Sequence, residues 1–335
     1  MSNRYVVTGG AGFIGSGLVR ALLAAGEDRV TVVDNLLSGH AGNLDEVRDR
    51  VDFHRVDIRD YEALLATFTD SEIVIHLAAI PSVPRSISEP VPSHDVNING
   101  TFNVFQAARE SGIRRVVYAA SSSAYGDTEV LPKVETMVPH PKSPYALQKL
   151  VGEYYGSVFA ECFGLEVVSL RFFNVYGPRQ DPNSPYSGVL SIFMKCLLEG
   201  TAPTIYGDGE QSRDFTYVED VANLVIKASL ANNVSGNVYN AGNGNRYTLN
   251  YIWSVLQQSV LQKSVLQQSV LQHNAGVTIA AKYGPARTGD VRHSQADTTA
   301  AVADLGHHPQ FSLEEGLQRT FEWYKQASRI EASVR

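Results

Sequence analysis

The sequence has few of the features that mark disulfide-bonded, metal-binding or nucleic-acid-binding proteins. Its only cysteines, Cys162 and Cys196, form no CxxC pair, so we expect neither a disulfide framework nor a thiolate zinc site, and a reducing compartment fits. The nine histidines form no HxxxH or HExxH pattern, and we expect no metal. A net charge of −7 and a pI of about 5.7 give a nucleic-acid partner no electrostatic support.

Long hydrophobic runs are also missing. The longest apolar stretch, IVIHLAAI at residues 73–80, is far too short to cross a bilayer. The first residues enter a strand-like pattern, RYVVTGG, without the charged and then apolar leader of a signal peptide. We therefore expect a soluble, cytoplasmic protein with no membrane partner.

What the chain does have is an ordinary globular composition and a regular alternation of apolar segments. Its 335 residues, 44% hydrophobic and 19% charged, are enough for one large or two medium domains. Helical patterns separate short β-branched runs; in one of them Ile14, Leu18 and Leu22 recur every four residues. This alternation predicts an α/β fold, a doubly wound parallel Rossmann sheet with helices on both faces. The expected strands are residues 5–9, 30–34, 51–57, 72–78, 114–120 and 166–173.

The alternation loosens in the second half of the chain. Proline, glycine and asparagine cluster at residues 177–188 and 203–209, as is typical of loops. We expect a Rossmann domain over residues 1–175, with a return segment near 214–243. A smaller C-terminal substrate-binding domain is expected over residues 176–335.

Residues 254–272 read SVLQQSVLQKSVLQQSVLQ, a five-residue repeat. A step of five residues advances about 140° beyond a full turn of an α-helix, so the Val-Leu pairs walk around the helix and form no single apolar stripe. We interpret the repeat as a tandem duplication that extends a helix or adds a surface loop, without chemistry of its own. A coiled coil that binds a partner is the alternative, but heptad spacing is missing.

The segment VVTGGAGFIGS closes the first expected strand and opens the first expected helix. Gly9, Gly12 and Gly15 allow a tight turn, and the helix N-terminus offers free N–H groups to a pyrophosphate. Asp34 follows about 20 residues later, as expected for an acid that binds ribose hydroxyls. Because a carboxylate repels a 2′-phosphate and the following NLLSG has no basic residue, we expect NAD, not NADP, in the Rossmann domain. The alternative is a glycine-rich turn without a ligand.

Tyr145 and Lys149, in SPYALQK, share one face of an expected helix. An ammonium near a phenol favours the phenolate, so we expect Lys149 to lower the pKa of Tyr145 and make it a base. The alternative is an exposed Tyr–Lys pair on a solvated helix. Ser121, Ser122 and Ser123 follow the fifth expected strand, where ligands of a doubly wound sheet bind, which favours the base.

Asp57 stands at the end of the third expected strand, just before Ile58. Two interpretations stay open for this carboxylate. It either contacts the adenine amine of the cofactor or only caps the end of the strand.

Together these motifs resemble those of the extended short-chain dehydrogenase/reductases and, within them, of the UDP-hexose 4-epimerases. The resemblance covers nearly the whole chain except residues 254–272, where the sequence is longer than the family pattern. The segments that carry it are TGGAGFIG, HLAA (76–79), SSSAYG (121–126), PYALQK (144–149), RFFNVYGPRQ (171–180), GDGEQSRDF (207–215) and RTGDVRHS (287–294).

The resemblance implies a role for each matching position. Tyr145 would be the base, Lys149 its partner and holder of the nicotinamide ribose, and Ser121 the group that hydrogen-bonds the reacting sugar oxygen. Tyr206 would pack on uracil, and Ser294 would gate the sugar pocket. The implied NAD contacts are Gly9, Gly12, Phe13, Ile14, Gly15, Asp34, Asn35, Ser38, Gly39, Asp57, Ile58, Leu77, Ala78, Ala79, Tyr145, Lys149 and Phe173. The implied substrate contacts are Ser82, Arg85, Ser121, Ser122, Ser123, Asn174, Val189, Tyr206, Arg213, Arg287, Asp290 and Ser294, among which Asn174, Arg213 and Arg287 grip the diphosphate.

The implied activity is NAD-dependent 4-epimerisation of a UDP-hexose through a transient 4-keto sugar. A small serine at position 294 leaves room for an N-acetyl group, so we expect UDP-GlcNAc/UDP-GalNAc, with or without UDP-Glc/UDP-Gal. Asp181, where uronate-specific relatives place an arginine, would repel a carboxylate. The alternatives are an epimerase for UDP-glucose only or for UDP-glucuronate.

Other reactions and classes are less well supported by the sequence. Ser122 and Ser123 stand where sugar dehydratases carry an Asp-Glu pair, and the glutamate of the decarboxylases is missing. A net oxidoreductase of the same family would release NADH, and a regulator that only binds NAD would be free to lose Tyr145 or Lys149. A homodimer is common in the family, and helices near residues 95–111 and 143–163 would supply its interface.

Overall fold

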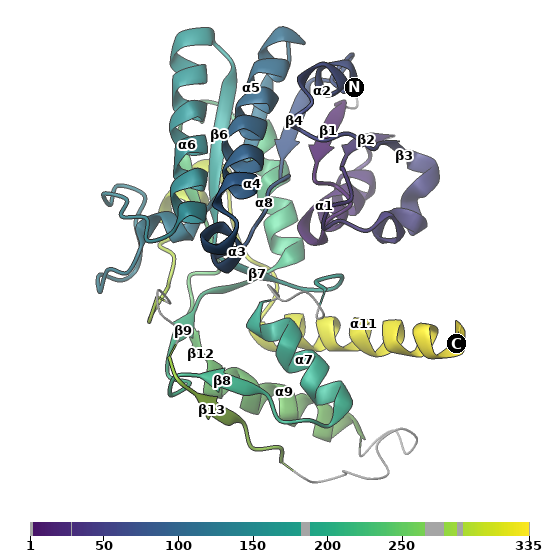
Figure 1. Ribbon diagram of the computed structural model, residues 1–335, viewed down its shortest axis with the longest axis vertical. Coiled ribbons are helices and arrows are strands. Elements are labelled where there is room, and N and C mark those ends of the chain that lie inside the picture. Colours follow the sequence, from purple (N-terminus) through teal and green to yellow (C-terminus); the bar gives the residue numbers. More distant parts are fainter. Residues whose placement is uncertain (1–2, 28, 182–187, 265–277, 287–290, 335) are drawn as a thin grey trace.

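The computed structural model describes residues 3–27, 29–181, 188–264, 278–286 and 291–334 (Figure 1). A large lobe is built around a parallel sheet, and a smaller lobe lies below it in the figure. Within these residues, no helix combines the length and the apolar character that crossing a membrane requires.

The large lobe is centred on a seven-stranded parallel sheet whose order reverses between β1 and β4. Doubly wound folds bind their ligands at this switch point, beyond the carboxyl ends of the strands. The expected Rossmann fold is therefore confirmed. In spatial order the strands are β11 (Val238–Ala241), β6 (Glu166–Phe172), β5 (Arg115–Ser121), β4 (Ile73–His76), β1 (Tyr5–Thr8), β2 (Val30–Val33) and β3 (Val51–His54).

All six strands expected in the first half form at the apolar runs, but β3 is shorter than expected. It ends at His54 and does not reach Asp57, because the amide of Val56 turns back to the carbonyl of His54 at 3.0 Å. Asp57 therefore belongs to the loop that follows the strand.

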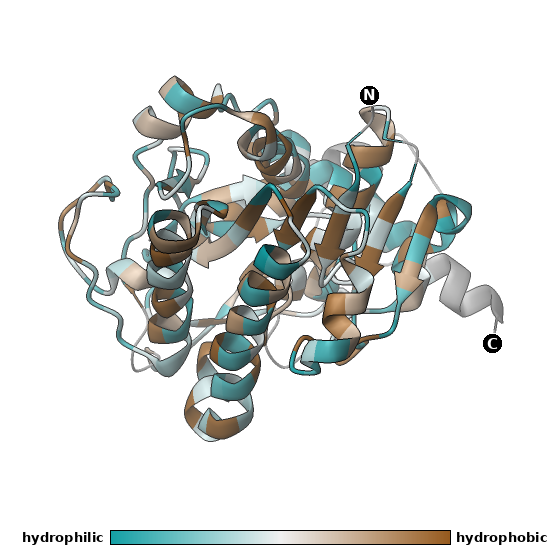
Figure 2. Ribbon diagram, turned by 90° about the horizontal axis from the view of Figure 1, so that it is seen from above, coloured by the Kyte–Doolittle hydropathy of each residue, from teal (hydrophilic) through white to brown (hydrophobic). Residues whose placement is uncertain are grey.

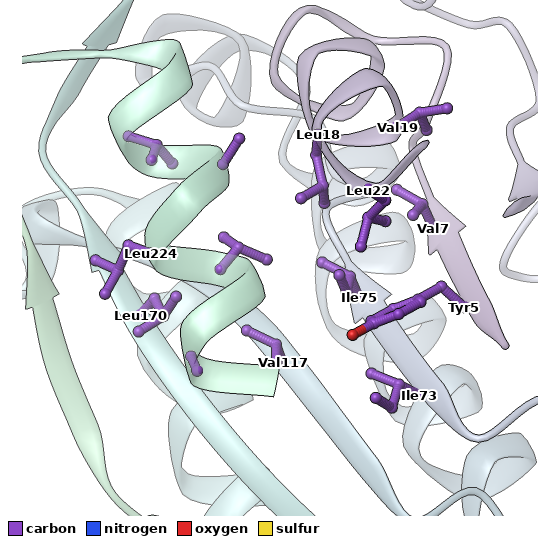
Figure 3. Packing of buried hydrophobic residues seen from close by; sticks show 14 of the residues in the cluster. Tyr5, Val7, Leu18, Val19, Leu22, Ile73, Ile75, Val117, Leu170 and Leu224 are labelled. Carbon is purple, nitrogen blue, oxygen red and sulfur yellow. The ribbon is translucent and has the colours of Figure 1, made fainter. Parts of the chain in front are cut away.

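Each face of the sheet has its own apolar core under its own helices. Alternate residues of a strand point to opposite faces, so Tyr5 and Val7 pack into one core and Val6 into the other. Figure 3 shows the first core, in which Leu18 of α1 and Leu224 of α8 lie over the strands. Seen from above, hydrophobic strands lie between the two helical layers (Figure 2). The first layer contains α1 (Phe13–Ala24), α8 (Val218–Leu230) and α10 (Thr299–Leu305); the second contains α2 (Tyr61–Thr67), α5 (Thr101–Glu110) and α6 (Pro144–Phe163).

Shorter segments complete the second helical layer and the loop after β2. The short helices α3 (Val83–Ser88) and α4 (Pro90–His94) lead into α5 through a π-helical turn, Asp95–Gly100. A 3₁₀ segment, Ala41–Arg50, joins the loop after β2 to β3, and a 3₁₀ turn, Ser122–Tyr125, follows β5.

The smaller lobe has a third core, in which Trp253 packs edge-on against Phe193 at 5.4 Å. After leaving the large lobe, the chain returns to the sheet through α8 and β11 before it completes the smaller one. The elements of this lobe are α7 (Val189–Glu199), α9 (Leu249–Ser264), α11 (Leu313–Val334), β8 (Thr204–Tyr206) and β13 (Lys282–Gly284). Between the lobes lie the pairs β7 (Asn174–Tyr176) with β10 (Phe215–Tyr217) and β9 (Ser212–Arg213) with β12 (Tyr247–Thr248).

The five-residue repeat begins inside α9. Residues 254–264 are helical, as the interpretation of an extended helix requires, and Val255 and Leu256 are buried in the third core. Residues 265–272 lie outside the described part of the chain.

Candidate active site

The glycine-rich loop after β1 is a turn in which side chains have no room. Gly9 has a φ of +73°, a left-handed conformation that favours glycine, and a Cβ there would lie 2.8 Å from the backbone nitrogen of Ala78. A Cβ on Gly15 would overlap the carbonyl oxygen of Gly9. Gly12 is the N-cap of α1, so the positive end of the helix dipole lies at this loop.

Asp34 follows β2 directly and is only 7% exposed. Its Oδ2 accepts a hydrogen bond from the amide of Ala11 at 3.0 Å, and its Oδ1 accepts one from the amide of Leu36 at 2.8 Å. Burial raises the pKa of Asp34, and these two bonds oppose the rise. A Cβ on Gly39 would lie 2.9 Å from Oδ2, so the loop that also carries Asn35 and the exposed Ser38 wraps closely around the carboxylate.

The segment after β4 lies against the glycine-rich loop. Leu77, Ala78 and Ala79 are half-buried there, and the amide of Leu77 donates to the carbonyl of Thr8 at 3.1 Å. His76, the last residue of β4, stabilises this contact because its two ring nitrogens hydrogen-bond with the hydroxyls of Thr8 at 2.8 Å and Thr101 at 3.0 Å. Burial lowers the pKa of His76 to about 3, so the imidazole is neutral.

Ser121, Tyr145 and Lys149 meet at the carboxyl end of β5. The hydroxyl of Ser121 lies near the phenol of Tyr145, and the Ser121 Oγ accepts a hydrogen bond from the hydroxyl of Ser123 at 2.8 Å. The Lys149 Nζ donates to the carbonyl of Ala119, on the same strand, at 2.8 Å. The half-buried Ser122 lies in the turn that follows.

The expectation that Lys149 lowers the pKa of Tyr145 is wrong for this structure. Burial raises the pKa of Tyr145 to about 12, and the nearby hydroxyl of Ser121 opposes the rise only in part. Burial likewise lowers the pKa of Lys149 to about 8, against the opposing effect of Glu153. The lysine is thus mainly cationic at neutral pH, but the phenolate of Tyr145 needs further positive charge.

Helix α3 is tied to the backbone of the candidate base. The Oγ of Ser86 accepts a hydrogen bond from the amide of Tyr145 at 3.1 Å. Ser82 caps α3 by accepting from the amide of Arg85 at 3.1 Å, and the Arg85 Nε is paired with Glu89 at 3.1 Å. Ser82 and Arg85 are therefore placed by the same short helix that holds Tyr145.

Asn174 and Arg213 lie together where the chain passes between the lobes. Both the amide and the Nδ2 of Asn174 donate to the carbonyl of Asp214 at 3.1 Å. The Arg213 guanidinium donates to the carbonyl of Arg292 at 3.1 Å. Two candidate diphosphate contacts therefore lie within one hydrogen-bonded patch.

Ser294 and Tyr206 border this patch. The half-buried Ser294 is held by its amide, which donates to the carbonyl of Ser212 at 3.0 Å. Tyr206 ends β8 and is 41% exposed, and its carbonyl accepts a hydrogen bond from Gln211 at 2.6 Å. The candidate uracil and sugar contacts are thus linked to Arg213 through Gln211 and Ser212.

Other candidates have different surroundings. Phe13 and Val189 pack against the core of the smaller lobe, and Ile58 is buried in the core under α2, α5 and α6. Ile14 packs against the opposite core, and Phe173 is buried beside the ring of Tyr125 at 6.4 Å. Arg287 and Asp290 lie outside the described residues.

Asp57 is held by its own loop. Its carboxylate accepts hydrogen bonds from the Arg59 side chain at 2.9 and 3.0 Å and from the Asn35 Nδ2 at 2.8 Å. The bonds from Arg59 are the main reason that the pKa of Asp57 is lowered to about 2. The carboxylate is therefore ionised and joins the loops after β2 and β3.

Comparison with known proteins decides the family. Residues 5–242 match the NAD dependent epimerase/dehydratase family. The chain belongs to this family. A putative UDP-glucose 4-epimerase of Methanocaldococcus jannaschii is 37% identical and covers 97% of this chain and 99% of its own. The UDP-glucose 4-epimerase of Mycolicibacterium smegmatis is also 37% identical, over 97% of this chain and 100% of its own.

Solved structures of family members superpose over nearly the whole chain. The UDP-N-acetylglucosamine 4-epimerase of Methanobrevibacter ruminantium M1, in complex with UDP-N-acetylmuramic acid, has a TM-score of 0.88 at 36% identity and covers 98% of this chain and 100% of its own. The UDP-glucose 4-epimerase of Thermotoga maritima, with UDP-glucose, has a TM-score of 0.88 at 37% identity, over 97% and 99%. The expected family, its NAD dependence and the enzyme class are confirmed, whereas the sugar is not resolved.

The residues of this epimerase-family chain fit the cofactor of the family. The missing Cβ atoms of Gly9 and Gly15 allow a pyrophosphate to approach the backbone at the start of α1. Each oxygen of the buried Asp34 carboxylate accepts one hydrogen bond from a backbone amide. Each can accept another, so the carboxylate can still bind ribose hydroxyls.

A buried ion pair that no sequence pattern predicted lies beneath the site of this family member. Arg171 donates to Glu153 through Nε at 3.0 Å and through a terminal nitrogen at 2.7 Å, and its guanidinium lies 4.5 Å from the ring centre of Tyr125. Glu153 lies one helical turn beyond Lys149 and raises the pKa of its ammonium. The four-residue spacing between Lys149 and Glu153 on α6 indicates that these two side chains are neighbours. No sequence pattern indicates that Arg171 on β6 pairs with Glu153.

Proposed function

We propose that the chain catalyses 4-epimerisation of a UDP-hexose through a transient 4-keto sugar, with UDP-GlcNAc/UDP-GalNAc as substrates, with or without UDP-Glc/UDP-Gal. The observation that carries the proposal is that the Tyr145 phenol lies near Ser121, and the Lys149 ammonium binds the Ala119 carbonyl on the same strand, in the same row of strand ends as the glycine-rich loop. Such a cluster suits proton transfer to and from a hydroxyl beside a bound dinucleotide.

In the proposed reaction, Tyr145 takes the proton of the sugar 4-hydroxyl and later returns it to the same oxygen. NAD, which the glycine-rich loop and Asp34 would hold, would supply a reversible hydride acceptor for C4, and its oxidised ring would carry positive charge. Ser121 hydrogen-bonds the sugar oxygen, and Lys149, whose ammonium donates to the carbonyl of Ala119 at 2.8 Å, holds the nicotinamide ribose. The positive charge that the buried phenolate requires would come from the oxidised nicotinamide.

The substrate has to be held while its sugar turns over. We assign this task to the nucleotide end, where Asn174, Arg213, Tyr206 and, from outside the described residues, Arg287 bind the diphosphate and uracil. Arginine suits the role because its planar fork pairs with phosphate in bidentate fashion. The keto sugar is then free to rotate while UDP stays in place.

The preference for N-acetylated sugars rests on Ser294. Its side chain is small and its backbone is fixed to Ser212, so the gate position that the resemblance assigns to it leaves room beside the sugar. Identity alone does not select a sugar, because relatives named for UDP-glucose and UDP-glucuronate match at 37% and 33%. Asp181, which is exposed, weighs against a uronate substrate.

A panel assay tests the function. Purified protein is incubated separately with UDP-Glc, UDP-GlcNAc and UDP-GlcA, and the products are resolved by NMR while NADH absorbance is followed. We expect interconversion of UDP-GlcNAc and UDP-GalNAc without lasting NADH. Accumulating NADH would indicate a net oxidoreductase, loss of water a dehydratase, and turnover of UDP-Glc or UDP-GlcA alone a different sugar.

We also propose that two copies of the chain pair through α5 and α6. These neighbouring helices expose large apolar side chains: Phe102 (39%), Leu147 (51%), Tyr154 (59%), Val158 (46%) and Phe163 (47%). A patch of this kind on a helix pair is typical of an interface. Sedimentation should give a dimer for the unaltered protein and a monomer for Leu147→Glu/Val158→Glu, whereas Val138→Glu, at an 88% exposed position outside both helices, should stay dimeric.

A further inference from the structure

Asp214 lies beside Arg213 and is fully buried, and its carboxylate accepts hydrogen bonds from two distant segments and from the nearby Thr216. Its Oδ1 accepts from the amide of Asn243 at 2.8 Å and from the hydroxyl of Thr216 at 3.3 Å. Its Oδ2 accepts from the amides of Gly244 at 2.9 Å and Ala296 at 3.0 Å. One side chain therefore joins β10, the loop after β11 and the segment that follows Ser294.

The backbone around Asp214 reaches the remaining substrate candidates. Its carbonyl accepts both hydrogen bonds from Asn174 at 3.1 Å. The segment anchored through Ala296 also carries Ser294 and the Arg292 carbonyl, which holds the guanidinium of Arg213 at 3.1 Å. Asn174, Arg213 and Ser294 are thus connected through one residue.

The segments around this carboxylate are closely packed. A Cβ on Gly242 would overlap Ala296 and lie 3.0 Å from the Asp214 Oδ2, so the two segments approach as closely as a glycine permits. Burial raises the pKa of Asp214 to about 6, although the four donors oppose the rise.

We propose that Asp214 is a positioning residue that fixes Asn174, Arg213 and Ser294 relative to one another and thereby sets the affinity for the UDP end of the substrate. This inference rests on the proposed function, because it assigns the three residues to substrate binding. Holding such groups in place before binding lowers the cost of ordering them in the complex.

The first test is Asp214→Asn in the NAD-loaded protein. The amide keeps only one acceptor oxygen, so its NH₂ faces two donors and the anchored segments separate. We expect the Kd of UDP-glucose, measured by titration calorimetry, and the KM to rise about tenfold, while kcat and bound NAD change little, as loss of charge-assisted hydrogen bonds predicts.

Asp220→Asn is the matched control. Asp220 is also a buried carboxylate that accepts backbone amides, from Gln310 at 2.7 Å and Phe311 at 3.3 Å, but it anchors α8 to the start of α11. Both variants should unfold more easily, and only Asp214→Asn should lose affinity for UDP-glucose. An equal rise in Kd for both variants would overturn the positioning role.

Thr216→Val decides the matter if Asp214→Asn does not fold. This change keeps the shape of the side chain and removes one of the four donors, so we expect a two- to threefold rise in Kd, on the order of one weak neutral hydrogen bond. An unchanged Kd in a folded Thr216→Val protein would count against the proposal. Failure of the unaltered protein to bind UDP-glucose and UDP-GlcNAc at all would instead overturn the proposed function and this inference together.

Discussion

The two ends of the candidate site are built in different ways. At the NAD end, Gly9, Asp34 and Leu77 each follow a strand of one sheet directly, and β1, with β2 and β4 on either side of it, places them together. At the UDP-sugar end, segments near 174, 213, 243 and 295 come from different parts of the chain and meet at Asp214.

This difference explains which end can be recognised from the sequence. A turn that excludes a Cβ needs glycine wherever it occurs, and an acid after the next strand is a local feature, so spacing predicts both. The substrate end depends on which distant amides reach one carboxylate, and no local pattern records that. There the sequence offered only the family resemblance.

The largest effect on turnover should come from the loss of the candidate base. Tyr145→Phe removes only the hydroxyl that exchanges the proton, so we expect kcat to fall by roughly 10²- to 10⁴-fold, the usual range for lost acid–base catalysis. Calorimetry and NAD content should show that both ligands still bind.

Tyr154→Phe is the control for this variant. Tyr154 lies on the same helix and is 59% exposed, and phenylalanine keeps its apolar ring in the proposed interface, so loss of the hydroxyl alone should leave turnover nearly unchanged. Near-normal turnover by Tyr145→Phe would remove Tyr145 from the role of base.

The next largest effect isolates the NAD end. Asp34→Ala deletes the ribose acceptor and two bonds to the amides of Ala11 and Leu36, at 3.0 and 2.8 Å. We expect NAD affinity to fall about 10- to 100-fold, as for lost hydrogen bonds to a charged group, with little change in the Kd of UDP-glucose.

The exposed carboxylate Asp45 supplies the comparison for that measurement. Asp45→Ala, in the 3₁₀ segment after β2, should retain NAD as the unaltered protein does. Parallel losses of NAD and UDP-glucose in Asp34→Ala would mean that the two ends do not act independently.

The sequence predicted the sheet well and the electrostatics of the site poorly. Strands and the glycine turn follow from apolar runs and from φ at Gly9, which are local properties. The pKa of Tyr145 is not a local property. The spacing places Lys149 on the same helix face, but it does not reveal that Tyr145 is buried or that the Lys149 ammonium donates to the carbonyl of Ala119. The Glu153–Arg171 pair likewise joins a helix and a strand with no shared pattern.

A moderate effect should distinguish recognition of the sugar from recognition of the nucleotide. Ser294→Tyr adds a ring at the proposed gate, and overpacking of this kind costs about 1–3 kcal/mol. We expect kcat/KM for UDP-GlcNAc to fall about tenfold or more, with that for UDP-Glc largely kept. Ser294→Ala should accept both sugars, and an equal loss on both in Ser294→Tyr would refute the gate.

The last prediction concerns stability and not turnover, namely how the stability of the substrate end changes with pH. Burial raises the pKa of Asp214 to about 6 from its ordinary 3.8, so between these values the folded protein binds more protons than the unfolded chain. Stability contributed by this group must therefore fall as pH rises from about 4 to 6, by on the order of 3 kcal/mol, and then level off. Tyr247, His293 and His307 also lie near this patch, and burial lowers the pKa of both histidines, but all three are present in Asp214→Asn as well, so their contributions largely cancel in the difference. Urea unfolding of both proteins across this range should show the free energy of unfolding of the unaltered protein, minus that of the variant, decreasing with pH. A difference that increases would mean that the four donors outweigh burial and that the carboxylate is stabilised in its charged form.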